Sequence, residues 1–153
     1  MSDAAQKIEV ELPFIRRYQT ADIMKQAHWL FPRLARLFPH MSREAHYTWL
    51  LNMLNSNDCI PLYHECGFAL AMMMSEPMRP NAYVEEVFVY LQDAAQPEQQ
   101  IVGAHFYNHF YSWTTQRGIK TLFIEKNTDV SRKSILEVTG SRVFESNQAY
   151  MRV

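Results

Sequence analysis

Apolar side chains recur at helical spacing near the start of the chain. They return every three or four residues between Ile23 and Phe38, and the preceding Thr20-Ala21-Asp22 is a typical helix start. Pro32 predicts a kink or a break inside this helix. Residues 14–18 predict a short strand in front of it.

A second helix and then a series of strands follow. The helix is expected to begin at Ser42, to place its apolar residues on one face and to end at the turn-forming residues 55–58. Residues 60–64 and 68–75 then predict a hairpin, and the β-branched and aromatic run at residues 83–91 predicts another strand.

The last third of the chain alternates helix and strand. After a polar loop, the predicted elements are a helix from about Val102 to Gln116, a strand at 122–125, a helix from Asp129 or Ser131 to about Thr139, and one or two strands at 143–151. The element order is then β-α-α-β-β-β-α-β-α-β. It predicts a single α/β domain over residues 1–153, with a mixed central sheet flanked by helices.

Composition and charge exclude several classes of partner. Fifteen Lys and Arg residues against sixteen Asp and Glu residues give a net charge of −1, so no large net basic charge drives binding to nucleic acid or to an anionic membrane. The longest apolar run, residues 68–74, is too short to span a bilayer. Because the two cysteines make no disulfide framework and the start is polar, we expect a soluble, cytoplasmic protein.

Glycine is scarce, and its four positions are informative. Gly67 lies in the predicted hairpin turn, whereas Gly103, Gly118 and Gly140 lie at a helix start, a helix cap and a helix end. A chain with so few glycines has no glycine-rich phosphate loop of the usual kind. The framework of the predicted fold therefore holds three of the four glycines.

The second half of the chain resembles the acetyltransferases of the GNAT superfamily. Gly103 and the Arg117-Gly118-Ile119 that closes the predicted helix are spaced like the last glycine of that family's phosphate loop and the end of its cofactor helix. Residues 84–89 are similar to the strand before the loop, and residues 129–140 to the following helix. The resemblance implies a GNAT-like mixed sheet of six to seven strands.

The same resemblance implies a site for acetyl-CoA. In the family a splayed strand, here Val87, Phe88 and Val89, exposes unpaired backbone groups to the pantetheine arm. The N–H groups at the helix start point at the pyrophosphate. An amine loses a proton to a base near the strand, and a tyrosine on the later helix protonates the thiolate. The other cofactor-binding positions implied here are Val102, Gly103, Ala104, Asp129 and Arg132.

The chain departs from the family pattern at the positions that carry chemistry. Glu98 and Ile101 stand where the loop has Gln or Arg and its inner glycine, so the cofactor loop is degenerate. Leu136 stands at the position of the tyrosine acid and cannot donate a proton, and Ser141 replaces the usual Phe. These departures predict weak activity or none.

Glu85 and Glu86 are the candidate catalytic residues. Adjacent residues of a strand point to opposite faces, so one of the two could enter the cleft and act as a general base through water. The alternative is one solvated glutamate and one ion-paired glutamate. No metal site is predicted, because His105 and His109 share a helix face without a third ligand.

Two further groups allow either a functional or an ordinary interpretation. The helix after residue 102 is aromatic on more than one face, which favours either a wall of the cofactor cleft or a docking surface. Arg33 and Arg36 lie in the first helical region, which forms the substrate-side wall in the family. They could also be the solvated arginines of an amphipathic helix.

The sequence leaves two functions open. The first is an acetyl-CoA-dependent N-acyltransferase with a degraded cofactor loop, acting on a small amine, a protein N-terminus or a lysine. The second is a non-catalytic GNAT-derived module that forms a homo-oligomer or binds a protein partner, for example within a viral particle. The surplus of nine methionines and twenty aromatic residues suits such an interface.

Overall fold

The protein, analysed as a computed structural model, is described for residues 12–75, 82–140, 143–144 and 150–152. Ser141 and residues 145–149 of the predicted last strands lie outside the described residues. The elements are β1 (Arg16–Arg17), α1 (Thr20–Leu37), α2 (Arg43–Leu54), β2 (Cys59–His64), β3 (Gly67–Met74), β4 (Tyr83–Leu91), α3 (Pro97–Gln116), β5 (Thr121–Phe123), α4 (Arg132–Thr139), β6 (Val143–Phe144) and β7 (Tyr150–Arg152). The predicted α/β class is confirmed.

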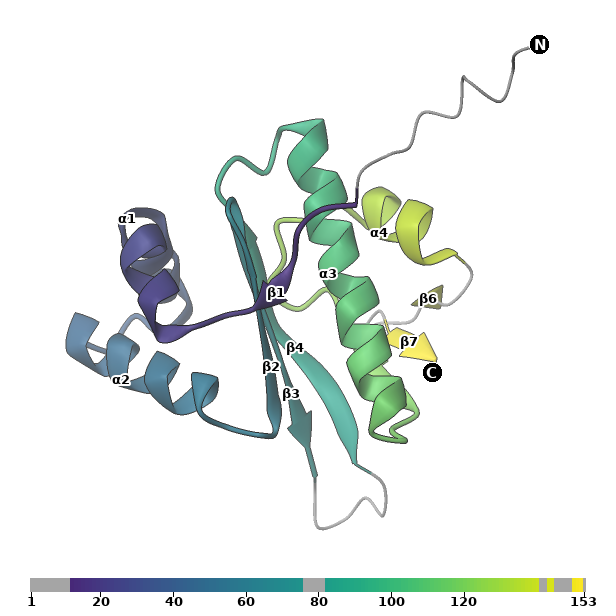
Figure 1. The fold of residues 1–153 in the computed structure, drawn as a ribbon, viewed down its shortest axis with the longest axis horizontal. Helices are drawn as coiled ribbons and strands as arrows, with labels where there is room; N and C mark the ends of the chain where they lie inside the picture. The colour runs from purple at the N-terminus through teal and green to yellow at the C-terminus, as the bar shows by residue number, and fades with distance from the viewer. Residues whose placement is uncertain (1–11, 76–81, 141–142, 145–149, 153) are drawn as a thin grey trace.

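One mixed sheet runs through the middle of the molecule. Its order is β1-β2-β3-β4-β5-β7-β6, and β4 with β5 is a parallel pair between antiparallel ones. Helices α1 and α2 cover one face of the sheet, and α3 with α4 covers the other (Figure 1). Two buried apolar clusters, one on each face, hold these layers together.

The N-terminal helices form largely as the sequence predicts. Helix α2 is capped by Ser42, whose side chain accepts a hydrogen bond from the N–H of Ala45 at 3.1 Å. Helix α1 starts at Thr20 and continues past Pro32 to Leu37, so the predicted break is absent. The strand expected at residues 14–18 is reduced to Arg16–Arg17.

Helix α3 begins earlier than predicted, and this changes the candidate cofactor site. It starts at Pro97, not at about Val102, because proline suits the first position of a helix, whose N–H has no helical partner. The polar residues that follow have no apolar periodicity, which led to the prediction of a loop. Val102, Gly103 and Ala104 therefore lie inside the helix and are buried.

Strand β4 carries the irregularity that shapes the centre of the fold. Leu70 of β3 pairs with Phe88, and Ala71 pairs with Glu86, so Val87 is an extra residue at a β-bulge. Beyond the bulge, β5 no longer pairs with β4. Residues 125–129, which follow β5 and which we call the closing segment, lie against β4 instead.

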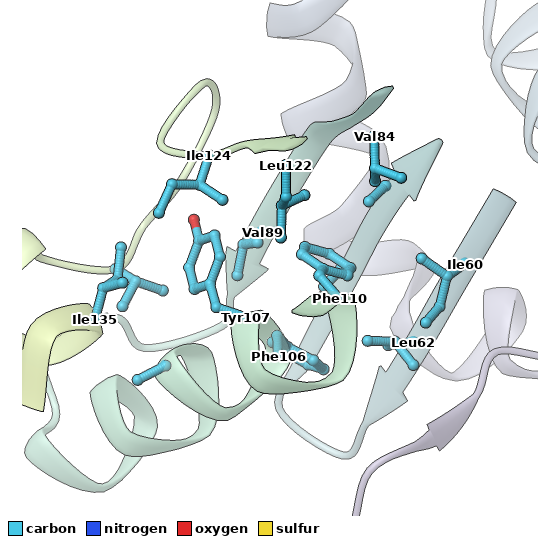
Figure 2. Close-up of a cluster of buried hydrophobic side chains, with 14 of the residues drawn as sticks. Ile60, Leu62, Val84, Val89, Phe106, Tyr107, Phe110, Leu122, Ile124 and Ile135 are labelled. Carbon is cyan, nitrogen blue, oxygen red and sulfur yellow. The ribbon is translucent and has the colours of Figure 1, made fainter. Parts of the chain in front are cut away.

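The aromatic side chains of α3 fill the space between this helix and the sheet. Phe106, Tyr107 and Phe110 are fully buried, and Figure 2 shows them among side chains of β2, β4 and β5. The Tyr107 hydroxyl points toward Ile124, just before the closing segment (Figure 2). No helix within the described residues is long and apolar enough to cross a membrane.

Candidate functional site

The closing segment occupies the backbone groups of β4 that the family resemblance left for pantetheine. The N–H of Val89 donates to the carbonyl of Asn127 at 2.9 Å, and the N–H of Asp129 donates to the carbonyl of Val89 at 3.0 Å. Asn127 Nδ2 donates to the carbonyl of Val87, and the N–H of Leu91 donates to Asp129 Oδ2, both at 2.9 Å. The expectation of unpaired groups on a splayed strand is therefore wrong for this half of β4.

Glu86 holds the closing segment from inside the protein. Its carboxylate accepts hydrogen bonds from the backbone N–H groups of Glu125 at 2.8 Å, Lys126 at 3.1 Å and Asn127 at 3.0 Å. The Tyr107 hydroxyl donates the fourth, at 2.5 Å. Glu125 has a φ of 63°, a left-handed conformation that turns the chain so that successive N–H groups converge on one carboxylate.

The surroundings of Glu86 do not suit a general base. The side chain is fully buried, and burial raises the pKa of the Glu86 carboxyl above its ordinary value while its four donors oppose that shift. Burial also raises the pKa of Tyr107 well above its ordinary value. Glu86 thus faces the protein interior, and all of its partners come from this chain.

Glu85 lies on the opposite face of β4 and is partly exposed. Its Oε1 forms an ion pair with Lys126 Nζ at 2.8 Å. One solvated and one ion-paired glutamate were the predicted alternative to a catalytic base. The ion-paired member is Glu85, whereas Glu86 is neither solvated nor paired with a cation.

A second contact fastens the end of the closing segment to α1. Arg33 Nη1 forms a close ion pair with Asp129 Oδ2, and Arg33 Nη2 donates to the carbonyl of Leu91 at 3.0 Å. Asp129 was expected to lie at the cofactor site. Here its carboxylate bridges the Arg33 guanidinium and the N–H of Leu91.

Gly103 lets α3 pack closely against Val130, the residue directly after the closing segment. A Cβ atom at this position would lie 2.3 Å from Val130 Cγ2 and 3.1 Å from Leu91 Cδ1. The N–H groups of Val102, Gly103 and Ala104 belong to helical turns, in which they point toward carbonyls four residues earlier. These residues are therefore not at a helix N-terminus, the position on which the predicted phosphate contact depended.

The true start of α3 is also poorly suited to a pyrophosphate. The carbonyl of Gln96 accepts hydrogen bonds from the N–H groups of Gln99 at 3.0 Å and Gln100 at 3.1 Å. Glu98 adds a negative charge to the first turn. A phosphate here would meet the Glu98 carboxylate, and the N–H groups of Gln99 and Gln100 already donate to Gln96.

Helix α4 lies beside the closing segment without supplying an acid. Arg132, predicted to bind cofactor, pairs with Glu125 at 2.9 Å. Leu136, at the position of the family's tyrosine, is 38% exposed. The residues present therefore do not fit acetyl-CoA bound along β4 in the arrangement that the resemblance implies.

No metal centre is evident in the part of the chain that the structure describes. Within those residues, no three His, Cys, Asp or Glu side chains come together in a way that could hold an ion. Burial lowers the pKa of both His105 and His109, as expected for imidazoles packed in a neutral form.

Sequence reasoning missed the residues that close β4. Asn127 and the pairing of Arg33 with Asp129 were not singled out, because the contacts join positions far apart in the chain. The run of polar residues directly after a short strand was the available signal. Such a run more often marks an ordinary loop.

Solved structures of other proteins share this fold. No protein-family model matches the chain, and no curated protein matches it. Among solved structures, a protein from Arthrobacter sp. FB24 aligns with a TM-score of 0.60 at 18% identity, over 94% of this chain and 92% of that one. An aminoglycoside antibiotic 6'-N-acetyltransferase from Acinetobacter baumannii aligns with a TM-score of 0.57 at 10% identity, over 87% and 90%.

An acetyltransferase from Vibrio fischeri aligns with a TM-score of 0.52 at 15% identity, over 77% of this chain and 96% of that one. The proteins from Acinetobacter baumannii and Vibrio fischeri are acetyltransferases, and this chain shares the GNAT-type fold of all three neighbours. At these identities the likeness is one of fold, so the function has to come from the site.

Proposed function

We propose that this protein is a non-catalytic GNAT-fold module that works through protein–protein contacts. The observation that supports this function is the pairing of β4 with the closing segment. The backbone groups of Val87, Val89 and Leu91, which would hold an acyl-CoA thioester in place, already have partners within the chain.

The chemistry of the individual residues supports the same function. Glu86, the more buried candidate base, accepts four hydrogen bonds from its own chain. Leu136 has no proton to donate to a leaving thiolate. Moving the closing segment away from β4 would separate Arg33 from Asp129 and would leave the Glu86 carboxylate buried without its three backbone donors, which is strongly unfavourable.

The proposed contact surface includes three exposed apolar side chains. Leu12, Phe14 and Met24 are 71%, 74% and 77% exposed, and we propose that they meet the partner. The partner is a second copy of the chain or another protein with an apolar surface. We expect Phe14→Ser with Met24→Ser to weaken that association in analytical ultracentrifugation, with Lys120→Gln as a surface control.

Thermal unfolding with acetyl-CoA tests the absence of cofactor binding. A site with a dissociation constant of about 10 µM would be stabilised by about 2.7 kcal/mol at 1 mM ligand. For a domain of this size, that gain in unfolding free energy corresponds to a rise in Tm of roughly 5–10 °C. We expect no rise, with an active acetyltransferase of the same fold as the positive control. A saturable increase would contradict the proposal.

The second candidate function is N-acyl transfer to an amine, and the shared fold with acetyltransferases favours it. It requires the closing segment to leave β4 when acetyl-CoA binds. Hydrogen exchange distinguishes the two functions, because acetyl-CoA would then change the protection of the Asn127 and Asp129 amides. Unchanged protection at millimolar acetyl-CoA supports the non-catalytic module.

A further inference from the structure

A polar cavity lies on the α1 side of the sheet, next to the closing segment. Its volume is about 350 Å³. It is lined by Arg33, Arg36, Leu37, Tyr90 and residues 126–129. The cavity is distinct from the backbone groups of β4 that the closing segment occupies, so it remains open while that segment is in place.

Three cations reach this cavity, and two of them are compensated. Arg33 pairs with Asp129, and Lys126 pairs with Glu85. Arg36 is exposed and forms no ion pair with any residue that the structure describes. The lining therefore keeps a surplus positive charge, although the whole chain carries −1.

Tyr90 forms part of the cavity wall and adds a hydroxyl group. The ring is 7% exposed, and the Arg33 guanidinium carbon lies 5.4 Å from its centroid. Burial raises the pKa of Tyr90 to about 12, while the positive charges of Arg33 and Arg36 act in the opposite direction. At neutral pH the hydroxyl is thus protonated and available as a hydrogen-bond donor beside two guanidinium groups.

We propose that this cavity binds a small anionic molecule through a carboxylate or phosphate group held by Arg36. A guanidinium presents two parallel N–H groups that match either oxyanion, and the hydrogen bonds are strengthened by charge. Arg33 and Lys126 line the same cavity but already pair with Asp129 and Glu85, so Arg36 is the cation left for the ligand. The Tyr90 hydroxyl supplies a neutral donor. The volume of about 350 Å³ exceeds that of one phosphate ion, so the cavity has room for a further organic part of the ligand.

Anion binding here goes beyond the proposed protein contacts and does not depend on them. The cavity is lined by the last turns of α1, at Arg33, Arg36 and Leu37, and by the closing segment. The exposed apolar residues are Leu12 and Phe14, before β1, and Met24, in the first turns of α1. A failure of one function therefore leaves the other intact. Association measured with Phe14→Ser and Met24→Ser is read separately from ligand binding.

Chemical-shift titration of the full chain tests the site. The probes are inorganic phosphate and succinate, added at constant ionic strength while the backbone amides of residues 126–129 are followed. We expect saturable shifts in the wild type, with an affinity about tenfold weaker in Arg36→Gln. Lys120→Gln, which removes an exposed positive charge elsewhere, should bind like the wild type.

The outcomes distinguish specific binding in the cavity from nonspecific attraction of anions to positive charge. Binding of either probe that weakens about tenfold in Arg36→Gln and is unchanged in Lys120→Gln supports the proposal, and the probe that binds more tightly identifies the recognised group as phosphate or carboxylate. Equal loss in both variants, or no saturable shift at 10 mM of either probe, overturns it. Tyr90→Phe should keep the ring packing and weaken binding by roughly threefold, which a purely structural Tyr90 would not do.

Discussion

Replacing Glu86 by glutamine separates a structural carboxylate from a catalytic base. The substitution keeps the shape of the side chain but exchanges one acceptor oxygen for an NH₂ group. In the better amide orientation, the Tyr107 hydroxyl turns to accept from that NH₂, and the other oxygen still accepts from Lys126 and Asn127. The N–H of Glu125 then loses its acceptor inside the protein.

The expected loss of stability follows from these contacts. An orphaned buried N–H costs about 1–3 kcal/mol, and the remaining bonds lose their charge assistance, so we expect a total of about 3 kcal/mol. With a urea dependence of about 2 kcal/mol/M, the unfolding midpoint should fall by about 1.5 M. Such a change is a large part of the stability of an ordinary domain.

The neighbouring residue supplies a matched control. Glu85→Gln makes the same chemical change one position away and removes only the exposed pair with Lys126, which is worth about 1 kcal/mol or less. The assay is urea unfolding followed by tryptophan fluorescence, together with hydrogen exchange of the Glu125 amide. If Glu86→Gln and Glu85→Gln unfold at the same urea concentration, the buried carboxylate does not hold the closing segment and our reasoning fails.

Three more outcomes are expected. Gly103→Ala should lower the unfolding free energy by about 1–2 kcal/mol, because the clash of its new Cβ with Val130 outweighs the better helix propensity of alanine; Val130→Ala should relieve that loss in a double-mutant cycle. Stability should fall between pH 7 and pH 5, because burial lowers the pKa of His64, His105 and His109, so the unfolded chain takes up these protons first. His64 Nδ1 accepts the Cys66 N–H, and His64→Gln should remove the His64 part of this dependence in urea titrations. Leu136→Tyr should give no acetyl transfer from acetyl-CoA to any amine tested, since a restored hydroxyl does not open β4.

Each of these results has a clear contrary outcome. A Gly103→Ala variant as stable as the wild type would mean that α3 shifts freely against Val130. A stability that rises on acidification would contradict the lowered pKa values of His64, His105 and His109. Turnover in Leu136→Tyr would favour the acyltransferase function.

Much of the fold was predictable because its signals are local. The β-branched and aromatic run at residues 83–91 gave the bounds of β4, and Ser42 marked the start of α2, where its side chain caps the helix. The spacing of Gly103 and Gly118 pointed to the GNAT fold, which the structural neighbours share. The start of α3 was missed because a polar first turn after Pro97 has the same composition as a loop.

What only the tertiary structure decided is which backbone groups of β4 are paired with residues 125–129. Alternation along a strand showed that Glu85 and Glu86 face opposite sides, but it does not say which side is solvent. The three backbone donors to Glu86 lie about forty residues further on, and a hydrogen bond across that distance leaves no periodic trace in the sequence. The sequence by itself indicated a GNAT-like framework that departs from the family pattern at the loop and tyrosine positions. Only folding brought residues 125–129 onto the half of β4 that the resemblance assigned to a cofactor.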